Sequence, residues 1–376
     1  MKTLQILDKL IAFDTVSANS NFHLVTYVEQ LLKTNGFRVT RIASPCGAKA
    51  GLFAEIGPCV EGGLLLSAHT DVVPVDGQTW TKPPFRLTVE GCKLFGRGTT
   101  DMKGFIASAL AAAAKAKGLD LQRPLAIVLS YDEEIGCVGL QQMRPDLLPL
   151  LRAPGLCVVG EPTEMQVATG HKGKTAFKAT FHGEAGHSAL APKFQNALHL
   201  AADFMGELRN VQKKISQIGP FDPDYDVPYT TLHVGMLSGG TALNIVPTMA
   251  EMQYEIRYLA DQDMTELEGQ ISTFVKNLNE GAADPRVELE RINSYPGLEV
   301  DVRQGWVRSI TEIAQQTLTK VAFGTEAGVL TDMGVPTLVC GPGSMAGQGH
   351  KADEFIHTHQ LEACDAFLDR LLADLC

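Results

Sequence analysis

The sequence has 376 residues, more than a single hydrophobic core usually organises, which favours a main domain with a second, smaller domain. Hydrophobic residues make up 45% of it and charged residues 20%, so the composition excludes a disordered or fibrous chain. The formal net charge is -11 and lysine and arginine form no runs. We therefore expect no nucleic-acid partner, because a phosphate backbone would be repelled.

The N-terminal pattern and the cysteines bear on the compartment. Asp8 and Lys9 interrupt the apolar residues of segment 2–13, which predicts an amphipathic helix and no signal peptide. The most apolar helical stretch, residues 105–114, is much too short for a bilayer core of about 30 Å, so we expect no membrane association. Eight cysteines occur without CxxC pairs, and several lie in apolar runs, as buried reduced thiols do. Together these features predict a cytoplasmic protein.

The first part of the chain alternates helix-like and strand-like patterns. Helices are predicted over residues 2–13, 24–34 and 101–117, and strands over residues 63–67 and 125–130. Asp101 is expected to cap the third of these helices, which has an alanine-rich body and ends at Gly118. Such alternation is typical of a three-layer α/β domain with a mostly parallel, buried sheet.

A different order of elements follows in the middle of the chain. The predicted elements are strand 175–181, helix 196–211, strands 230–237 and 249–258, helix 264–278 and strand 287–292. This βαββαβ order is that of a ferredoxin-like α+β domain inserted in the larger one. The α/β pattern then resumes with a helix over residues 306–319 and a strand over residues 337–340. We thus divide the chain into a main domain, residues 1–174 and 296–376, and an insert, residues 175–295.

Ionisable residues follow the predicted strands of the main domain. His69 and Asp71 follow the strand that starts near residue 64, and Asp132, Glu133 and Glu134 follow the strand at 125. Glu161 follows the strand at 156, and His350 comes after the strand at 337. Open α/β sheets bind their ligands at the carboxyl ends of their strands, so these side chains are expected to converge. A mixed set of imidazoles and carboxylates suits Zn²⁺, Co²⁺ or Mn²⁺.

Individual residue types suggest roles in such a site. Asp101 could bridge two ions roughly 3.5 Å apart. Asp71, two residues after His69, is placed to accept the second ring proton of that histidine. In the pair Glu133 and Glu134, one carboxylate can bind metal while the other accepts a proton from water. Each residue could instead have a purely structural role, in a solvated loop, as a helix cap or as a core histidine. Their recurrence at successive strand ends nevertheless favours a metal site.

Other catalytic templates are absent from the sequence. Residues 96–101 imitate half of a dinucleotide-binding loop, but the last position is aspartate rather than glycine. There is no GxSxG motif for a serine nucleophile, and no cysteine lies in a recognisable nucleophile motif.

At these positions the sequence resembles the M20 metallopeptidase family over essentially the whole chain. The motifs are HTDVVPV at 69–75, GRGTTDMKG at 96–104, DEE at 132–134 and GEPT at 160–163. The resemblance implies two divalent ions, zinc foremost with cobalt as the other option, bridged by Asp101. It assigns His69 and Glu161 to one ion, Glu134 and His350 to the other, and the general acid/base role to Glu133. It also implies a cis peptide between residues 101 and 102.

The insert resembles the lid and dimerisation domain of the same family, which implies a homodimer formed through it. The segment Gly186-His187-Ser188 is similar to the family's histidine motif, so His187 would polarise the substrate carbonyl. The alternative is an ordinary surface histidine. Asn244 and Arg257 are similar to family positions that hold the substrate carboxylate, a task that suits the arginine fork.

Two loops are similar to those of acetylornithine deacetylases within the family. They are FGTEAG at 323–328 and CGPGS at 340–344, and the first places Gly324, Thr325 and Glu326 at the substrate. Glu326 could receive the ammonium of ornithine, or it could have a structural role in its loop. The resemblance thus implies hydrolysis of a small N-acyl amino acid, N-acetyl-L-ornithine, in arginine biosynthesis. The segment QGHKADE at 348–354 departs from the family's usual AHQPDE but keeps His350.

Three alternatives remain beside this function. The nearest is the removal of succinate from succinyl-diaminopimelate, or deacylation of another N-acyl amino acid. A non-catalytic metal-binding scaffold is disfavoured, because a scaffold has no use for the unligated base Glu133. Two-metal phosphate ester hydrolysis is disfavoured because the acidic chain has no basic phosphate cradle.

Overall fold

The computed structural model describes residues 2–376, which fold as two compact units. Unit 1 consists of the chain up to His171 together with Leu298–Cys376, and unit 2 consists of Lys172–Gly297. The predicted insert, residues 175–295, thus falls inside unit 2. Among the residues described, no helix has both the length and the apolar character needed to cross a membrane.

The main sheet of unit 1 is parallel in its centre and antiparallel toward both ends. Its order is β1-β2-β6-β3-β7-β15-β8-β13, and β14 pairs with β8 outside this path. The strands are β1 (Arg38–Ala43), β2 (Ala50–Ile56), β3 (Leu64–His69), β6 (Leu125–Ser130), β7 (Leu156–Val159), β8 (Val167–His171), β13 (Leu298–Glu299), β14 (Leu318–Val321) and β15 (Thr337–Val339). The four central strands β6, β3, β7 and β15 pair in parallel.

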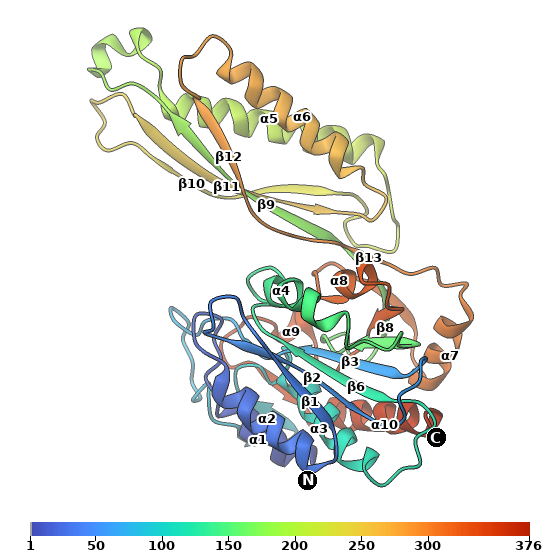
Figure 1. Ribbon diagram of the computed structural model, residues 1–376. Coiled ribbons are helices and arrows are strands. Elements are labelled where there is room, and N and C mark those ends of the chain that lie inside the picture. Colours follow the sequence, from blue (N-terminus) through green and yellow to red (C-terminus); the bar gives the residue numbers. More distant parts are fainter. Residues whose placement is uncertain (1) are drawn as a thin grey trace. The chain divides into compact units, whose positions relative to one another are not determined.

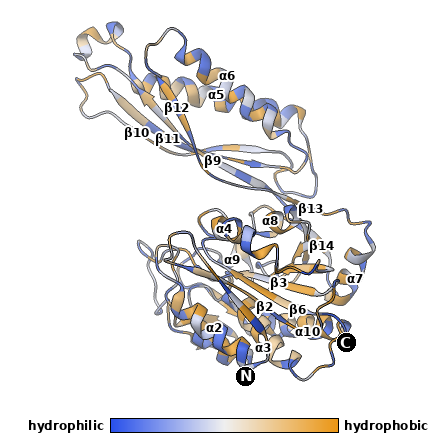
Figure 2. Cartoon of the chain, in the orientation of Figure 1, coloured by the Kyte–Doolittle hydropathy of each residue, from blue (hydrophilic) through white to orange (hydrophobic). Residues whose placement is uncertain are grey.

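Helices cover both faces of this sheet. Figure 1 shows α1, α2, α3 and α10 on one face and α4 and α8 on the other. The helices of unit 1 are α1 (Thr3–Ile11), α2 (Phe22–Thr34), α3 (Lys103–Ala116), α4 (Val138–Leu147), α7 (Gly305–Ala314), α8 (Ala327–Asp332), α9 (Met345–Gln348) and α10 (Thr358–Asp374). Every residue of β3 and β6 is buried, and Figure 2 shows these central strands as strongly hydrophobic. The predicted three-layer α/β fold is confirmed.

Two predicted helix boundaries in unit 1 are wrong. Asp101 does not cap α3, because the helix begins at Lys103 after Met102, and no side chain caps it. The helix predicted over residues 306–319 ends at Ala314, where Gln315 adopts the left-handed conformation with φ 57°. The following β-branched residues favour a strand, and β14 pairs there with β8.

A small antiparallel sheet in unit 1 joins distant parts of the chain. Its order is β16-β5-β4, with β4 (Thr88–Glu90), β5 (Lys93–Phe95) and β16 (Phe355–His357). The pairing of β5 with β16 places the loop that leads to Asp101 beside the loop that carries His350.

Unit 2 has the predicted ferredoxin-like order and a core of its own. Its elements are β9 (Gly173–His182), α5 (Ala197–Ile218), β10 (Thr231–Gly239), β11 (Met249–Tyr258), α6 (Met264–Asn279) and β12 (Val287–Tyr295), with a short 3-10 helix over Ser188–Lys193. The antiparallel sheet has the order β10-β11-β9-β12, and α5 and α6 pack on it around Phe181, Phe204 and Tyr254. Helix α5 runs beyond the predicted residue 211, because its apolar face continues with the buried Ile215.

Candidate metal centre

The parallel strands of unit 1 bring the predicted ionisable residues to one edge of the sheet. His69 is the last residue of β3, Glu133 and Glu134 follow β6, and Glu161 follows β7. Asp101 lies just before α3, with a cis peptide bond between Asp101 and Met102, as the family resemblance implies. Because the strands run in parallel, their carboxyl ends meet at this edge.

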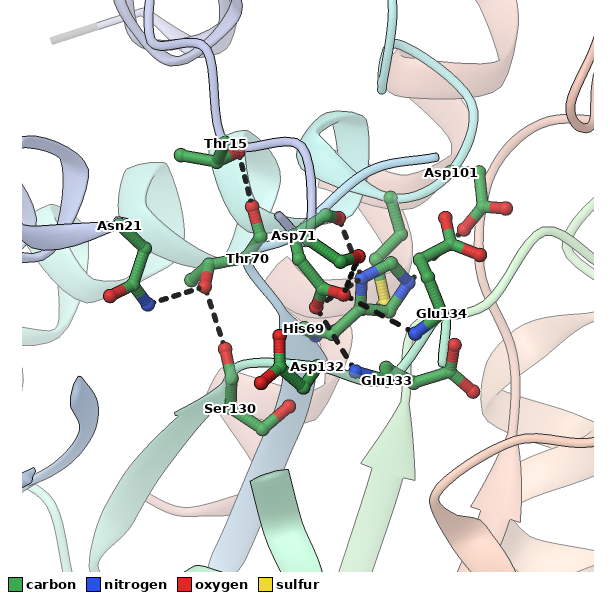
Figure 3. A network of polar contacts seen from close by, with 12 residues as sticks. Thr15, Asn21, His69, Thr70, Asp71, Asp101, Ser130, Asp132, Glu133 and Glu134 are labelled. Atoms are coloured by element: carbon green, nitrogen blue, oxygen red, sulfur yellow. Dashed lines mark hydrogen bonds and ion pairs between the residues drawn. The ribbon is translucent and has the colours of Figure 1, made fainter. Parts of the chain in front are cut away.

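The carboxylate of Asp101 lies between two groups of side chains. Its Oδ1 is 3.1 Å from Nε2 of His69, which is in turn 3.5 Å from Oε1 of Glu161. Its Oδ2 is 3.3 Å from Nε2 of His350, which is in turn 3.1 Å from Oε2 of Glu134. The structure thus places the five predicted ligands in two groups that share Asp101 (Figure 3 shows its relation to His69 and Glu134).

The donor atoms are close enough to surround a cation. Ligand atoms of His69, Asp101 and Glu134 lie within 4.8 Å of one another, and so do those of His69, Glu133 and Glu161. Imidazole nitrogens and carboxylate oxygens in such a mixed set suit zinc or a similar divalent ion. Glu133 thus lies next to the position where His69 and Glu161 could hold an ion.

The charges of the centre also fit a cation. Burial, together with the nearby charge of Asp101, raises the pKa of Glu133 to about 7 and that of Glu134 to about 8. Burial and the same charge raise the pKa of Glu161 well above its usual value. Crowded buried carboxylates resist ionisation unless positive charge is near, and a divalent ion would supply that charge.

The two histidines balance part of this negative charge. Hydrogen bonds to Asp101 and Glu134 raise the pKa of His350 to about 10. Burial opposes the same shift at His69, yet its hydrogen bond to Asp101 and neighbouring carboxylates raise its pKa well above the usual value. Burial also disfavours ionised Asp101, but the two imidazoles outweigh it and lower the pKa of that carboxyl group. Metal binding would therefore displace protons from both histidines.

Asp71 makes different contacts from those predicted for it. The ring Nδ1 of His69 is 2.9 Å from the main-chain oxygen of Asp71 and 3.6 Å from its carboxylate, which is too far for a hydrogen bond. The carboxylate instead accepts the main-chain N–H groups of Glu133 and Glu134, at 3.1 and 3.3 Å, and the hydroxyl of Ser17 at 2.7 Å. Asp71 therefore orients the loop that carries both glutamates (Figure 3).

Neighbouring polar groups fix the ends of β3 and β6. The main-chain N–H and the hydroxyl of Thr70 both donate to the carbonyl of Ser130, at 3.0 and 2.7 Å. Asn21 donates to the hydroxyl of Thr70 at 3.0 Å, and Thr15 donates to its carbonyl at 2.7 Å (Figure 3). These bonds hold the two strand ends, and so His69 and the glutamate loop, at a fixed separation.

A buried thiol contacts Glu133. Cys137 has its Sγ 3.3 Å from Oε1 of Glu133 and is placed to donate a hydrogen bond to it. Asp132, just before Glu133, has a positive φ of 56° and is held by an ion pair with Lys49. The sequence analysis missed Cys137, although its position four residues after Glu133 was a signal that the two side chains could meet.

Glu326 lies in unit 1 near this loop. It is fully buried, and neither carboxylate oxygen has a hydrogen-bond partner of normal geometry among residues 2–376. Burial raises its pKa to about 7, against an opposing effect of the nearby Ser130 hydroxyl. Its charge helps to raise the pKa of Glu133. The hydroxyl of Thr325 accepts the N–H of Ala327 at 3.0 Å, and Gly324 is half-buried. The carboxylate of Glu326 is thus not used by the hydrogen bonds of its own loop.

The three predicted residues of the insert belong to unit 2. The Nδ1 atom of His187 accepts the N–H of Ala189 at 3.1 Å, which places the proton of a neutral ring on Nε2. Asn244 is adjacent, because its carbonyl accepts the N–H of Ser188 at 3.1 Å. Both residues are exposed.

Arg257 of unit 2 is engaged within its own sheet. Its Nε donates to Glu255 at 2.9 Å, and its Nη1 donates to the hydroxyl of Tyr295 at 2.9 Å.

Comparison with known proteins adds to this geometry. The sequence matches the profile of peptidase family M20/M25/M40 over residues 65–374. It is 33% identical over 329 residues to an acetylornithine deacetylase of Aliivibrio salmonicida (strain LFI1238), an alignment that covers 87% of this chain and 85% of that protein.

Solved structures share the fold. The M20 family metallo-carboxypeptidase Sso-CP2 from Sulfolobus solfataricus has a TM-score of 0.82 at 18% identity, over 99% of this chain and 98% of that one. The YXEP protein of Bacillus subtilis, described as a dinuclear metal binding peptidase from the M20 family, has a TM-score of 0.67 at 15% identity, over 99% and 97%.

Proposed function

This chain belongs to peptidase family M20/M25/M40, and from that premise we propose that it is a two-metal amide hydrolase that converts N-acetyl-L-ornithine and water to L-ornithine and acetate. The observation that carries the proposal is the position of Asp101. One of its oxygens faces His69 and the other faces His350, with Glu133 beside the cluster. This arrangement offers two cation sites and a base next to them.

The proposed ligand sets follow the two groups around Asp101. His69 and Glu161 would hold one divalent ion, Glu134 and His350 the other, and Asp101 both. Zinc suits these donors best, and cobalt is the other option. Divalent ions held there would supply Lewis acidity toward the amide carbonyl and would make water a stronger acid.

Glu133 is proposed to move the proton. Its carboxylate would accept a proton from the attacking water and would later return it to the departing amine nitrogen, so that acetate and the free amine leave. Burial raises its pKa in the metal-free protein, and cations held beside it would favour the ionised form that accepts a proton. The N–H groups held by Asp71 and the thiol of Cys137 fix its direction.

Residues of unit 2 are proposed to complete the site. The Nε2–H of His187 would donate to the developing oxyanion, and Asn244 and Arg257 would hold the substrate carboxylate. Either the same subunit or a partner subunit could supply them.

Glu326 is proposed to bind the end of the substrate's side chain. An unpaired buried carboxylate is well suited to receive the terminal ammonium of ornithine, since that pairing offsets the cost of burying the charge. Succinyl-diaminopimelate carries further carboxylates instead, and residues 327–330 contain no arginine to receive one.

A comparison of substrates tests the proposal. Enzyme reconstituted with zinc or cobalt should have a much higher kcat/KM on N-acetyl-L-ornithine than on N-succinyl-L,L-diaminopimelate or on other N-acyl amino acids. Faster turnover of the succinyl substrate would make the chain a desuccinylase. A clear preference for another N-acyl amino acid would identify the enzyme as a deacylase of that substrate. A role in cytoplasmic arginine biosynthesis would follow only from the first outcome.

A further inference from the structure

A buried carboxylate outside the proposed ligand set accepts hydrogen bonds from the loop that leads to Asp101. Glu354 is fully buried, and its Oε1 accepts the main-chain N–H groups of Thr100 at 2.8 Å and of Asp101 at 3.1 Å. Its Oε2 accepts the N–H of Gly98 at 3.0 Å and Nη1 of Arg97 at 2.7 Å. Hydrogen bonds to an ionised acceptor are about twice as strong as neutral ones, and each buried N–H would otherwise lack a partner.

The same network reaches the loop of His350 by a second route. Nη2 of Arg97 donates to Oε1 of Gln78 at 2.6 Å, and Nε2 of Gln78 donates to the main-chain oxygen of His350 at 2.8 Å. Arg97 is buried almost completely, and its guanidinium lies over the ring of Trp80. The chain Glu354–Arg97–Gln78 therefore connects the main chain at Asp101 with the main chain at His350.

His350 needs such support more than the other proposed ligands do. It lies in a loop after the short helix α9, has a positive φ of 61°, and leaves 54% of its side chain exposed, whereas the side chain of His69 is 1% exposed at the end of a buried strand. The pairing of β5 with β16 begins just beyond Glu354 and aligns the two loops. Fixed loops are required here, because a metal site demands defined ligand positions.

We propose that Glu354 is a positioning residue that, through its contacts with the Asp101 loop and with Arg97 and Gln78, sets the separation of Asp101 and His350 and so determines the affinity of one metal site. This inference rests on the proposed two-metal function. It concerns chiefly the ion held by Asp101, Glu134 and His350, because both loops that Glu354 fixes supply ligands to that ion, whereas the ion held by His69 and Glu161 shares only Asp101 with this network.

Glu354→Gln tests the inference, because glutamine keeps the shape but replaces an acceptor oxygen with an NH₂ group that faces main-chain N–H donors. We expect one of the two ions to bind about 10- to 100-fold more weakly, the usual effect of removing a group that orients a ligand, and the other, which shares Asp101 but not His350, to be weakened less. Elemental analysis after dialysis gives the stoichiometry, and calorimetric titration of the metal-free protein with zinc gives both affinities.

Glu55→Gln is the matched control. Glu55 is also a buried carboxylate of unit 1 and pairs with Arg38 at 2.6 Å and Arg152 at 3.2 Å, but it contacts no proposed ligand. This variant should lower the unfolding temperature to a similar degree and still bind two ions with wild-type affinity. A merely structural role for Glu354 would make the two variants alike in metal binding.

Gln78→Met provides a second route if Glu354→Gln does not fold, since Gln78 is only half-buried. It removes the bond to the carbonyl of His350 and should weaken the same single ion. Wild-type affinity for two ions in the folded variants would overturn the inference while leaving the proposed function intact. A wild-type protein that binds fewer than two ions would instead refute the two-metal function itself.

Discussion

Glu133 and Glu134 are adjacent in sequence, yet their contacts assign them different tasks. Glu134 lies 3.1 Å from His350, whereas Oε1 of Glu133 accepts a hydrogen bond from the thiol of Cys137 at 3.3 Å. Glu133→Gln should therefore keep both ions and lower kcat by at least about 10²- to 10⁴-fold, because the amide cannot carry a proton. Metal analysis and steady-state rates on one sample measure both quantities. Near-native turnover would refute the base assignment.

The opposite result is expected for the proposed ligands. Glu134→Ala or His350→Ala removes a donor to one ion, so activity should fall through loss of metal, and excess zinc or cobalt should partly restore it. Metal content and activity are measured across a titration of added ion. If both variants retained the wild-type metal content, the ligand assignment would be wrong.

Glu326 provides a residue-level test of substrate choice. Glu326→Gln should lower kcat/KM on N-acetyl-L-ornithine more than on N-acetyl-methionine, because only the former has a terminal ammonium to pair with the carboxylate. Steady-state kinetics on both substrates give the ratio. Equal losses on the two would exclude the ammonium-binding role and leave the metal chemistry untouched.

At the scale of elements, the patterns predicted regular segments well and their irregular ends poorly. Strands β6 and β11 have the predicted bounds, because a continuous apolar run identifies β6 and alternation of buried and more exposed residues identifies β11. The end of α7 was missed, since the left-handed Gln315 has no glycine to mark it.

The same distinction holds for the candidate site. Side-chain types after strands predicted that His69, Glu134, Glu161 and His350 converge, and the family resemblance added Asp101 and the assignment to two ions. The roles of Asp71 and Glu354 depend instead on main-chain N–H groups, which nearly every residue has. Residue identity gives no signal for such contacts, so they could not be predicted from the pattern.

An open strand of unit 2 leads to a prediction about assembly. β10 is an edge of its sheet, and Met236 on it is 63% exposed. Exposed edges with apolar side chains favour pairing with another chain, so we propose a homodimer through this strand. Sedimentation should give a dimer at micromolar concentration, and Met236→Lys should shift it toward monomer.

Ile292→Lys on β12, the opposite edge, is the control for this prediction. Ile292 is 47% exposed and the change is of the same kind, yet the dimer should persist. A wild-type protein that sediments as a monomer would contradict the proposal, and loss of the dimer in the control alone would move the interface to β12.

At the scale of the whole molecule, the charges of the metal centre predict how stability depends on pH. The raised pKa values of Glu133, about 7, and Glu134, about 8, mean that the folded metal-free protein binds more protons than the unfolded chain. The raised pKa of His350, about 10, acts in the same direction. Stability of the metal-free protein should therefore fall as pH rises from about 5 to about 8.

Thermal unfolding of metal-free and zinc-loaded protein across this range measures the effect. The zinc-loaded protein should lose much less stability with rising pH, because the ions replace the protons that the carboxylates and histidines would otherwise hold. A metal-free protein whose unfolding temperature is constant or rises over the same range would show that these groups do not titrate as described.

The interruption of unit 1 by unit 2 has a consequence for the order in which a ribosome completes the protein. β15 occupies the position between β7 and β8, and it is synthesised after all of unit 2. Since domains fold as they emerge, unit 2 can form its core while the sheet of unit 1 still lacks this strand and the centre still lacks His350. The metal centre is therefore assembled last during translation, and a nascent chain stalled before residue 337 presents the unpaired edges of β7 and β8 to chaperones.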